Sequence, residues 1–274
     1  MADTLAGLAH RTGTDVGVVR VDARSRATET LIVVFPGFIM PAAEVAQAFA
    51  PHLRANVGLL VVQYADRGVD PSRIHAALLP EINRLRPYNL VFYGASMGGM
   101  CAYDFLLRAK HELPGTPGLV LDTAPASVED VRRPGWSFWL ASRYRGGPLA
   151  SGVWNALSRL PVSRPTPEVD ADASLIVRSR SRSAKVGMPA ITSQAAYIGG
   201  FRLRHTDLTG RIHYLRANPA TQDPLIKVDQ AIIHWRAVHP SLKVSSISSR
   251  RGDWHIPLVE RPAETVAAIL ASSN

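Results

Sequence analysis

A serine bracketed by glycines is the feature of this chain best suited to covalent chemistry. Ser96 stands at the centre of G-A-S-M-G, residues 94–98, between an apolar run at 90–93 and a helical pattern at 97–110. A G-x-S-x-G run between a strand and a helix is typical of a nucleophile elbow, a strained turn that exposes the serine hydroxyl above a sheet. Glycine is needed on both sides because side chains there would collide. The pattern predicts a nucleophilic Ser96; the alternative is a glycine-rich turn with an incidental serine.

A serine nucleophile needs a base, and the base needs an acid to orient it. Serine is a weak nucleophile at neutral pH and must lose its proton as it attacks a carbonyl. Of the nine histidines, His255 stands between the last expected strand and the C-terminal helix, where a base for Ser96 would be placed. Asp223, in the loop after the preceding strand, is the expected acid. Asp122, at the end of the strand that follows the elbow helix, is the alternative acid.

Backbone amides are the groups expected to stabilise a developing oxyanion. Residues 30–38 read T-L-I-V-V-F-P-G-F, an apolar strand broken by proline and glycine. The N–H of Phe38, after this break, and the N–H of Met97, directly after the serine, are the candidate donors. Neither role depends on a side chain, and the alternative reading of the break is a turn that only ends the strand.

Strands and helices alternate along most of the chain. Strands are expected at residues 16–21, 30–35, 57–64, 90–93, 119–122, 211–217 and 242–247, and helices at 41–53, 71–85, 97–110, 226–238 and 263–270. Several of these strands are continuous apolar runs, as strands covered on both faces require. The alternation predicts an α/β fold: a mostly parallel open sheet with helices on both faces.

The alternation lapses between residues 124 and 201. We interpret this stretch as a helical lid inserted over the C-terminal edge of the sheet, where ligands bind in open α/β folds. Residues 1–123 and 202–274 would then form the core. Trp136, Trp139 and Trp154 in the insertion either line a pocket for an apolar acyl group or fasten the insertion to the core.

With these elements in order, the chain resembles the α/β-hydrolase family in its smaller single-domain form with a lid. The resemblance rests on residues 35–38 and 94–98 together with Asp223 and His255, which follow the family's order of serine, acid and histidine. It covers nearly the whole chain from about residue 30. It implies that His255 takes the serine proton, that Asp223 fixes the histidine tautomer, and that an acyl-enzyme forms on Ser96.

The activity implied by the resemblance is hydrolysis of a carboxylic ester or a thioester with an apolar acyl group. Acyl transfer by the same triad, and a non-catalytic ligand-binding protein of this fold, are the alternatives. A serine at the elbow argues against the branches of the family that use a carboxylate nucleophile. One departure concerns the oxyanion loop: many relatives have His-Gly where this chain has Pro36 and Gly37. A side chain that often braces the loop is therefore missing.

Charge and composition limit the expected partners. The chain has 31 Lys and Arg against 22 Asp and Glu, a formal net charge of +9, but the basic residues are scattered, so we expect no nucleic-acid partner. The densest basic group would face a phosphate-bearing thioester, an anionic membrane surface or only solvent; its members are Arg178, Arg180, Arg182 and Lys185. No zinc-ligand spacing and no Walker or dinucleotide glycine pattern occurs, so we expect no metal and no cofactor.

Two further observations bear on the compartment. Cys101 is the one cysteine, so no intramolecular disulfide can form, and its place in the helix after the elbow predicts a small buried thiol. No apolar run approaches the roughly 18 residues of a membrane span, and residues 1–14 have no signal-peptide core. We expect a cytoplasmic protein, with peripheral contact to membranes or lipids left open.

Overall fold

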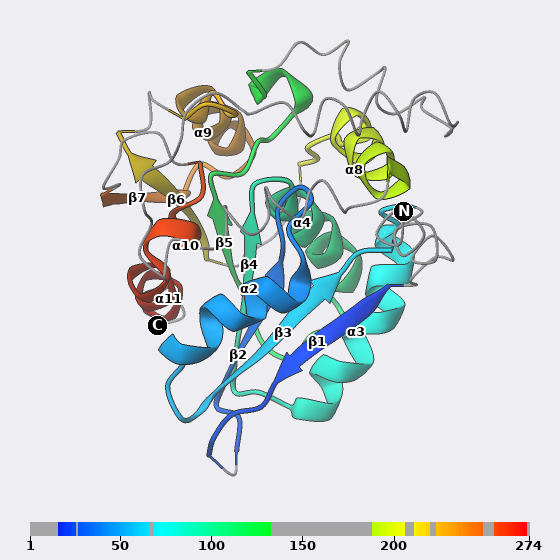
Figure 1. The fold of residues 1–274 in the computed structure, drawn as a ribbon, viewed down its shortest axis with the longest axis vertical. Coiled ribbons are helices and arrows are strands. Elements are labelled where there is room, and N and C mark those ends of the chain that lie inside the picture. Colours follow the sequence, from blue (N-terminus) through cyan, green and yellow to red (C-terminus); the bar gives the residue numbers. More distant parts are fainter. Residues whose placement is uncertain are drawn as a thin grey trace, which may run out of the picture.

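A twisted sheet forms the centre of the protein (Figure 1). The computed structural model describes residues 16–25, 27–65, 68–132, 188–205, 211–219, 223–248 and 255–272. Within these residues the sheet has seven strands in the order β1-β3-β2-β4-β5-β6-β7. They are β1 (Gly17–Val21), β2 (Thr30–Phe35), β3 (Val57–Gln63), β4 (Asn89–Ala95), β5 (Gly118–Asp122), β6 (Ile212–Asn218) and β7 (Lys243–Ser248). Only β1 pairs antiparallel, against β3, and the other pairs are parallel, which confirms the mostly parallel sheet.

The central strands are buried because helices cover both faces of the sheet. In β2 every residue is buried. Successive side chains of a strand point to opposite faces, so Leu31 and Val33 pack into one apolar cluster while Ile32 and Val34 pack into another. The continuous apolar run that predicted this strand therefore fills two cores at once.

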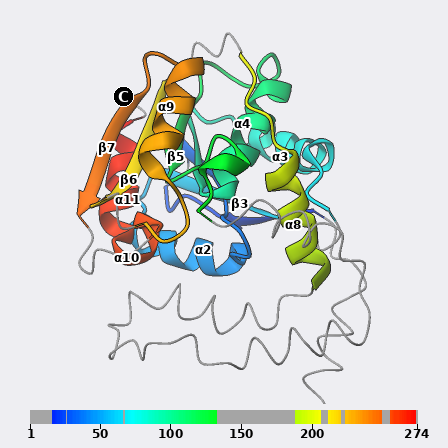
Figure 2. The ribbon, with the colours of Figure 1, turned by 90° about the horizontal axis from the view of Figure 1, so that it is seen from above.

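The helices divide between the two cores. One core takes residues from α3 (Pro71–Leu85), α4 (Met97–Ala109), α8 (Met188–Gly200) and α9 (Val228–Val238). The other takes residues from α2 (Ala42–Phe49), α10 (Pro257–Glu260) and α11 (Pro262–Ala271). Figure 2, the view from above, shows α2 and α10 on the opposite side of the sheet from α3 and α4. The expected covering of both faces is confirmed.

Two helices differ from the expectation for a physical reason. The helix expected at residues 41–53 ends at Phe49 and continues as a 3-10 turn, η1 (Ala50–His52). Pro51 has no N–H to donate to the carbonyl one turn earlier, so the α-helix cannot continue through it. The short helix α10, with Pro257 at its start, was not predicted because four residues carry no helical periodicity.

The described part of the expected insertion consists of residues 124–132 and 188–201. It contains a 3-10 turn, η2 (Val128–Asp130), and the helix α8. Other residues predicted to matter there lie outside the described residues: Trp136, Trp139, Trp154, Arg178, Arg180, Arg182 and Lys185. The division into a core and a lid therefore stays a prediction.

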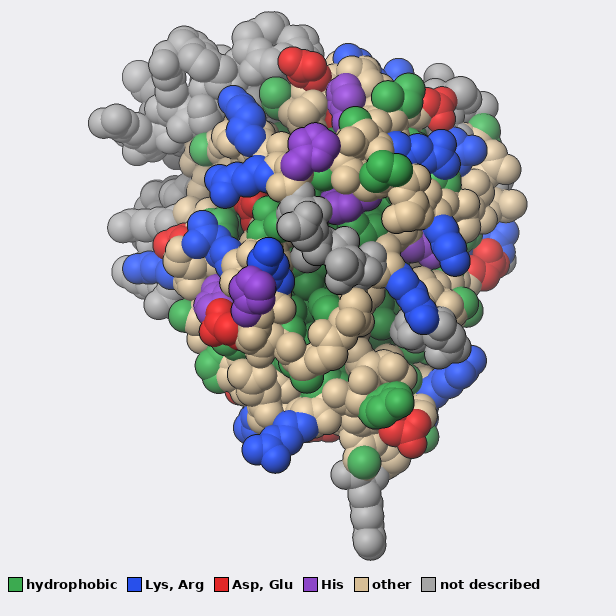
Figure 3. Space-filling view, turned by 180° about the vertical axis from the view of Figure 1, so that it is seen from behind, with side chains coloured by type: hydrophobic (Ala, Val, Ile, Leu, Met, Phe, Trp, Pro, Cys, Tyr) green, Lys and Arg blue, Asp and Glu red, His purple; other side chains and the backbone are tan. Residues whose placement is uncertain are grey.

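Basic side chains do not gather on the face shown in Figure 3, where Lys and Arg alternate with histidine, polar and apolar groups. In the described ranges no helix combines the length and apolar character needed to cross a membrane. Nor does any group of three or more His, Cys, Asp or Glu side chains in those ranges form a candidate metal site.

Candidate active site

Ser96 occupies a strained turn between β4 and α4. Its φ is 50° and its ψ is −119°, a conformation that costs a non-glycine residue on the order of 1–3 kcal/mol and persists where its surroundings enforce it. The Ser96 N–H donates to the Asp122 carbonyl at 2.8 Å, and the Ser96 carbonyl accepts from the Gly99 N–H at 2.9 Å. Both hydrogen bonds fix the turn from neighbouring elements.

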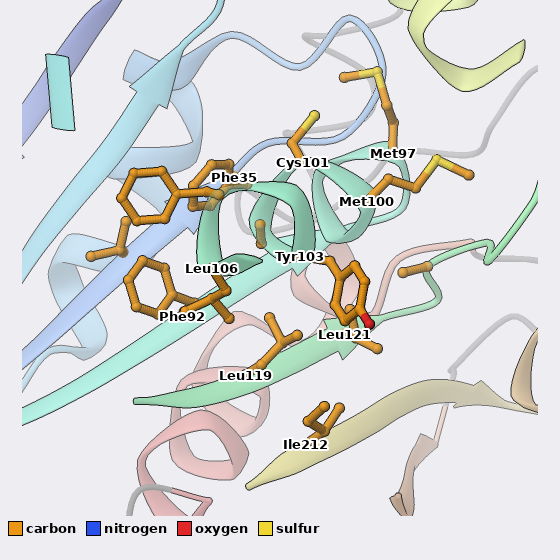
Figure 4. Packing of buried hydrophobic residues seen from close by; sticks show 14 of the residues in the cluster. Phe35, Phe92, Met97, Met100, Cys101, Tyr103, Leu106, Leu119, Leu121 and Ile212 are labelled. Carbon is orange, nitrogen blue, oxygen red and sulfur yellow. The ribbon is translucent and has the colours of Figure 1, made fainter. Parts of the chain in front are cut away.

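The glycines around Ser96 allow three stretches of backbone to meet. A Cβ at Gly98 would lie 1.9 Å from the Phe35 carbonyl oxygen, and a Cβ at Gly94 would lie 2.4 Å from Gly99 Cα. Such separations exclude any side chain at either position. Buried side chains of α4, among them Cys101 and Tyr103, leave the helix in different directions and pack into the core (Figure 4). The elbow is thus held between the end of β2 and the helix that follows it.

His255 joins Ser96 to Asp223 although the three residues come from different loops. His255 Nε2 lies 2.7 Å from Ser96 Oγ, and His255 Nδ1 lies 2.7 Å from Asp223 Oδ2. All three residues are buried. A carboxylate oxygen can only accept a hydrogen bond, so Nδ1 carries the ring hydrogen and Nε2 keeps a lone pair for the Ser96 hydroxyl. This arrangement can remove a proton from the serine.

The second oxygen of Asp223 is fixed by its own loop. Asp223 Oδ1 accepts from the N–H groups of Leu225 and Ile226, each at 2.7 Å. The same loop is pinned to the segment after β5: Ile226 forms an antiparallel bridge with Val131, and the Arg132 N–H donates to the Leu225 carbonyl at 2.7 Å. The orientation of the carboxylate toward His255 therefore depends on residues at the start of the expected insertion.

Asp122, the alternative acid, has other partners. Its carboxylate accepts from the hydroxyl of Tyr93, from the hydroxyl of Thr123 at 3.1 Å, and from the backbone N–H of Leu258. Burial raises the pKa of Asp122 to about 7, while these hydrogen bonds and the nearby His255 ring act in the opposite direction. Among the described residues, the hydrogen-bond partner of His255 Nδ1 is Asp223 and not Asp122. Asp122, at the end of β5, instead links Tyr93 of β4 to Leu258 at the start of α10.

The two candidate oxyanion donors lie at the ends of neighbouring elements. Phe38 is in the loop after β2, and Met97 is the first residue of α4, where a helix leaves its amides without intrahelical acceptors. Among the described residues, neither amide donates to another protein group. A Cβ at Gly37 would lie 3.1 Å from the Ala95 carbonyl oxygen, so the loop passes close to the elbow. With respect to the described part of the chain, both amides are therefore available as candidate donors to an anionic oxygen.

Two contacts to the oxyanion loop were missed from the sequence. The Tyr64 hydroxyl donates to the Pro36 carbonyl at 3.0 Å, and Gln194 Oε1 accepts from the Ile39 N–H at 2.7 Å. Tyr64 directly follows β3, whose end lies beside that of β2, and this adjacency was a usable signal. Gln194 lies 155 residues from Ile39, and nothing local in its helix points to that partner.

Comparison with known proteins finds similarity in structure alone. No family model matches the chain, and no curated protein matches its sequence. A thermophilic esterase from Thermogutta terrifontis aligns over 94% of each chain with a TM-score of 0.64 and 14% identity. The esterase RhEst1 from Rhodococcus sp. ECU1013 aligns over 96% of this chain and 100% of its own, with a TM-score of 0.63 and 18% identity.

A third neighbour is the type II thioesterase BorB from the borrelidin biosynthetic cluster, with a TM-score of 0.59 and 16% identity over 95% of this chain and 97% of its own. Identity this low carries information about the fold and none about the activity of this chain. These structural neighbours share one architecture, and their overlap with nearly the whole chain shows that this protein has the α/β-hydrolase fold.

Proposed function

We propose that this protein hydrolyses a carboxylic ester or a thioester through an acyl-enzyme on Ser96. The observation that carries the proposal is the continuous contact from Ser96 Oγ through the His255 ring to Asp223, with 2.7 Å at each step. A buried nucleophile, a base and an orienting acid in this order are the parts that acyl transfer to water requires. The strained turn at Ser96 supports it further, because it presents the hydroxyl toward the histidine.

The reaction takes two steps. As Ser96 Oγ attacks the carbonyl carbon, its proton passes to His255 Nε2, and the negative charge on the carbonyl oxygen is stabilised by the N–H groups of Phe38 and Met97. The His255 proton then goes to the departing alcohol or thiol, which leaves an acyl-enzyme. Water attacks the acyl-enzyme with His255 as base and releases the acid and the free serine. Asp223 stabilises the imidazolium in both steps.

The substrate class rests on the neighbours and on the sequence. The neighbours include esterases and thioesterases, which supports an acyl substrate with an oxygen or sulfur leaving group. The preference for an apolar acyl group rests on Trp136, Trp139 and Trp154 in the expected lid. A series of p-nitrophenyl esters and acyl thioesters from two to twelve carbons would test this preference through kcat/KM. An optimum at two carbons in both series would contradict it.

Labelling with a fluorophosphonate tests the nucleophile directly. The probe should add once to the native chain, and peptide mapping should place the adduct on Ser96. S96A should remove the adduct because the nucleophile is gone, and H255A should remove it because the hydroxyl is no longer activated. Heat-denatured native protein serves as the control for an accessible but unactivated serine. A native protein that takes up no label, or an H255A variant that labels at the native rate, would contradict the proposal.

A further inference from the structure

The loop that carries the Phe38 amide bends at a residue poorly suited to its backbone conformation. Ile39 has a φ of 55°, in the left-handed region that β-branched residues avoid because Cβ approaches the neighbouring carbonyl. Pro36 offers no side-chain hydrogen bond to its own loop. A conformation of this kind persists only where surrounding groups hold it. The loop therefore depends on contacts from elsewhere in the chain.

Two buried side chains supply those contacts, one on each side of Phe38. The Tyr64 hydroxyl donates to the Pro36 carbonyl at 3.0 Å. Gln194, 5% exposed, accepts from the Ile39 N–H on its Oε1 at 2.7 Å. The first contact fixes the peptide unit between residues 36 and 37, and the second fixes the unit between residues 38 and 39. The unit that contains the Phe38 N–H lies between them.

We propose that Gln194 is a positioning residue for the oxyanion hole, acting through the Ile39 amide. Peptide units are planar, so a unit held between two fixed neighbours can turn only through the few φ and ψ angles that join them. Gln194 thereby sets the direction of the Phe38 N–H before substrate arrives. Preorganised donors of this kind stabilise the transition state because they need no reorientation during the reaction. The catalytic part of this inference rests on the proposed function.

The helix that carries Gln194 is itself anchored on the same face. Residues three and four positions apart on a helix are neighbours, so Gln194 shares a face of α8 with Tyr197 and Ile198. The Tyr197 hydroxyl donates to Asp104 Oδ2 on α4 at 2.6 Å, and Ile198 is buried in the core shared with α4. The helix that follows the elbow and the oxyanion loop are therefore linked through one face of α8.

Kinetics of Gln194→Met test the catalytic consequence. Methionine keeps the length and apolar volume of the side chain but removes the acceptor for the Ile39 N–H. With p-nitrophenyl butyrate as probe we expect kcat to fall about tenfold or more, KM to stay within about twofold, and the thermal midpoint to stay near that of the native protein. Tyr64→Phe removes the other contact to the loop at nearly constant volume and should lower kcat in the same way. It is the second variant to measure in case Gln194→Met folds poorly.

Ser193→Ala is the matched control for Gln194→Met. The Ser193 hydroxyl donates to the Ala190 carbonyl within α8 and not to the loop, so this variant should keep native kcat. A Gln194→Met protein with native kcat would overturn the proposal. A Gln194→Met protein that loses kcat only because part of it is unfolded at the assay temperature, as a lowered thermal midpoint would show, would also overturn it. Gln194 would then be a structural residue only.

Hydrogen exchange at the Ile39 amide tests the contact without any assay of activity. Exchange at this amide should be at least about tenfold faster in Gln194→Met than in the native chain. It should remain slow in Gln194→Glu, which keeps an acceptor oxygen, and in Ser193→Ala. Unchanged exchange in Gln194→Met would overturn the inference. A native protein that takes no fluorophosphonate label but shows the expected exchange pattern would refute the proposed function alone, leaving the contact to the loop established.

Discussion

Asp223 and Asp122, the two carboxyl groups near His255, make different contacts. Asp223 contacts His255 Nδ1 at 2.7 Å, and its other oxygen is held by two backbone amides. Asp122 is fully buried, with its carboxyl group among Tyr93, Thr123 and the Leu258 amide. The first arrangement orients an imidazole, and the second joins the elbow strand to the helix after His255.

Exchanging each acid for its amide separates these tasks. Asp223→Asn should lower kcat/KM by on the order of 10³–10⁴-fold, because an amide in that place favours the wrong histidine tautomer. Asp122→Asn should stay within about tenfold of the native value, because Asp122 has no hydrogen bond to the base. Steady-state kinetics with p-nitrophenyl butyrate would measure both. An Asp122→Asn variant as impaired as Asp223→Asn would assign the acid's role to Asp122.

The sequence identified the candidate nucleophile and base more sharply than their partners. Ser96 is marked by two nearby glycines, and His255 by its place after the last strand, both of which are local signals. The acid stayed open because Asp122 and Asp223 both follow strands of a parallel sheet and reach the same edge. Gln194 was missed because its contact spans 155 residues, and no local pattern encodes such a distance.

At the scale of elements, the close approach of β2, β4 and α4 determines the shape of the site. The positions that cannot carry a side chain are those where two backbones touch. A side chain can be added on a helix surface that faces open space. Gly98 in the elbow and Gly199 in α8 are glycines of these two kinds and can be compared.

Gly98→Ala should destabilise the protein by on the order of 2–4 kcal/mol and abolish fluorophosphonate labelling, because its Cβ would lie 1.9 Å from the Phe35 carbonyl oxygen. Gly199→Ala in α8 is the control: a Cβ there would meet no described atom within 4 Å apart from the adjoining residues and the backbone of its own helix, and alanine suits a helix better than glycine by about 0.5–1 kcal/mol. Urea denaturation measures both variants. A Gly98→Ala protein as stable as the native one would show that the elbow can open.

The reactivity of the Cys101 thiol measures whether α4 stays packed against the core. The thiol is buried, and burial raises its pKa to about 12. At pH 8 only about one thiol in 10⁴ would then be a thiolate, the form that reacts. Iodoacetamide should therefore leave the folded chain unmodified over hours and add once in urea, as followed by intact mass. Rapid addition to the folded chain would indicate frequent opening around α4.

At the scale of the whole molecule, the pattern of alternating strands and helices was sufficient to predict the sheet. Long apolar runs predicted β2 and β3, and the helix expected at residues 71–85 is α3 itself. Boundaries were less predictable where proline ends a helix, as at Phe49, and the four-residue α10 was too short to show a period. The apolar pattern thus predicted which elements form, whereas their ends depended on single residues such as Pro51, which lacks the N–H needed to continue a helix.

The unfolding free energy of the protein should depend on pH through the protonation of Asp122. Burial raises its pKa from 3.8 to about 7, so the folded state binds this proton more tightly than the unfolded state does. The stability contributed by the bound proton is fully present below pH 4 and is lost as the pH rises through 7. Between pH 4 and pH 8 the native protein should lose about 4 kcal/mol more unfolding free energy than Asp122→Asn. Urea denaturation at each pH measures this difference, and parallel profiles would contradict it.

The spacing of the site along the chain also has a consequence during translation. Ser96 precedes His255 by 159 residues, and Asp223 precedes it by 32. A ribosome therefore completes the elbow strand long before it adds His255, the proposed base, and Ser96 lacks its histidine partner until β7 and the residues after it have emerged. On the proposed function, an ester or thioester would be safe from the growing polypeptide, and hydrolysis would begin only once the sheet has gained its last strand.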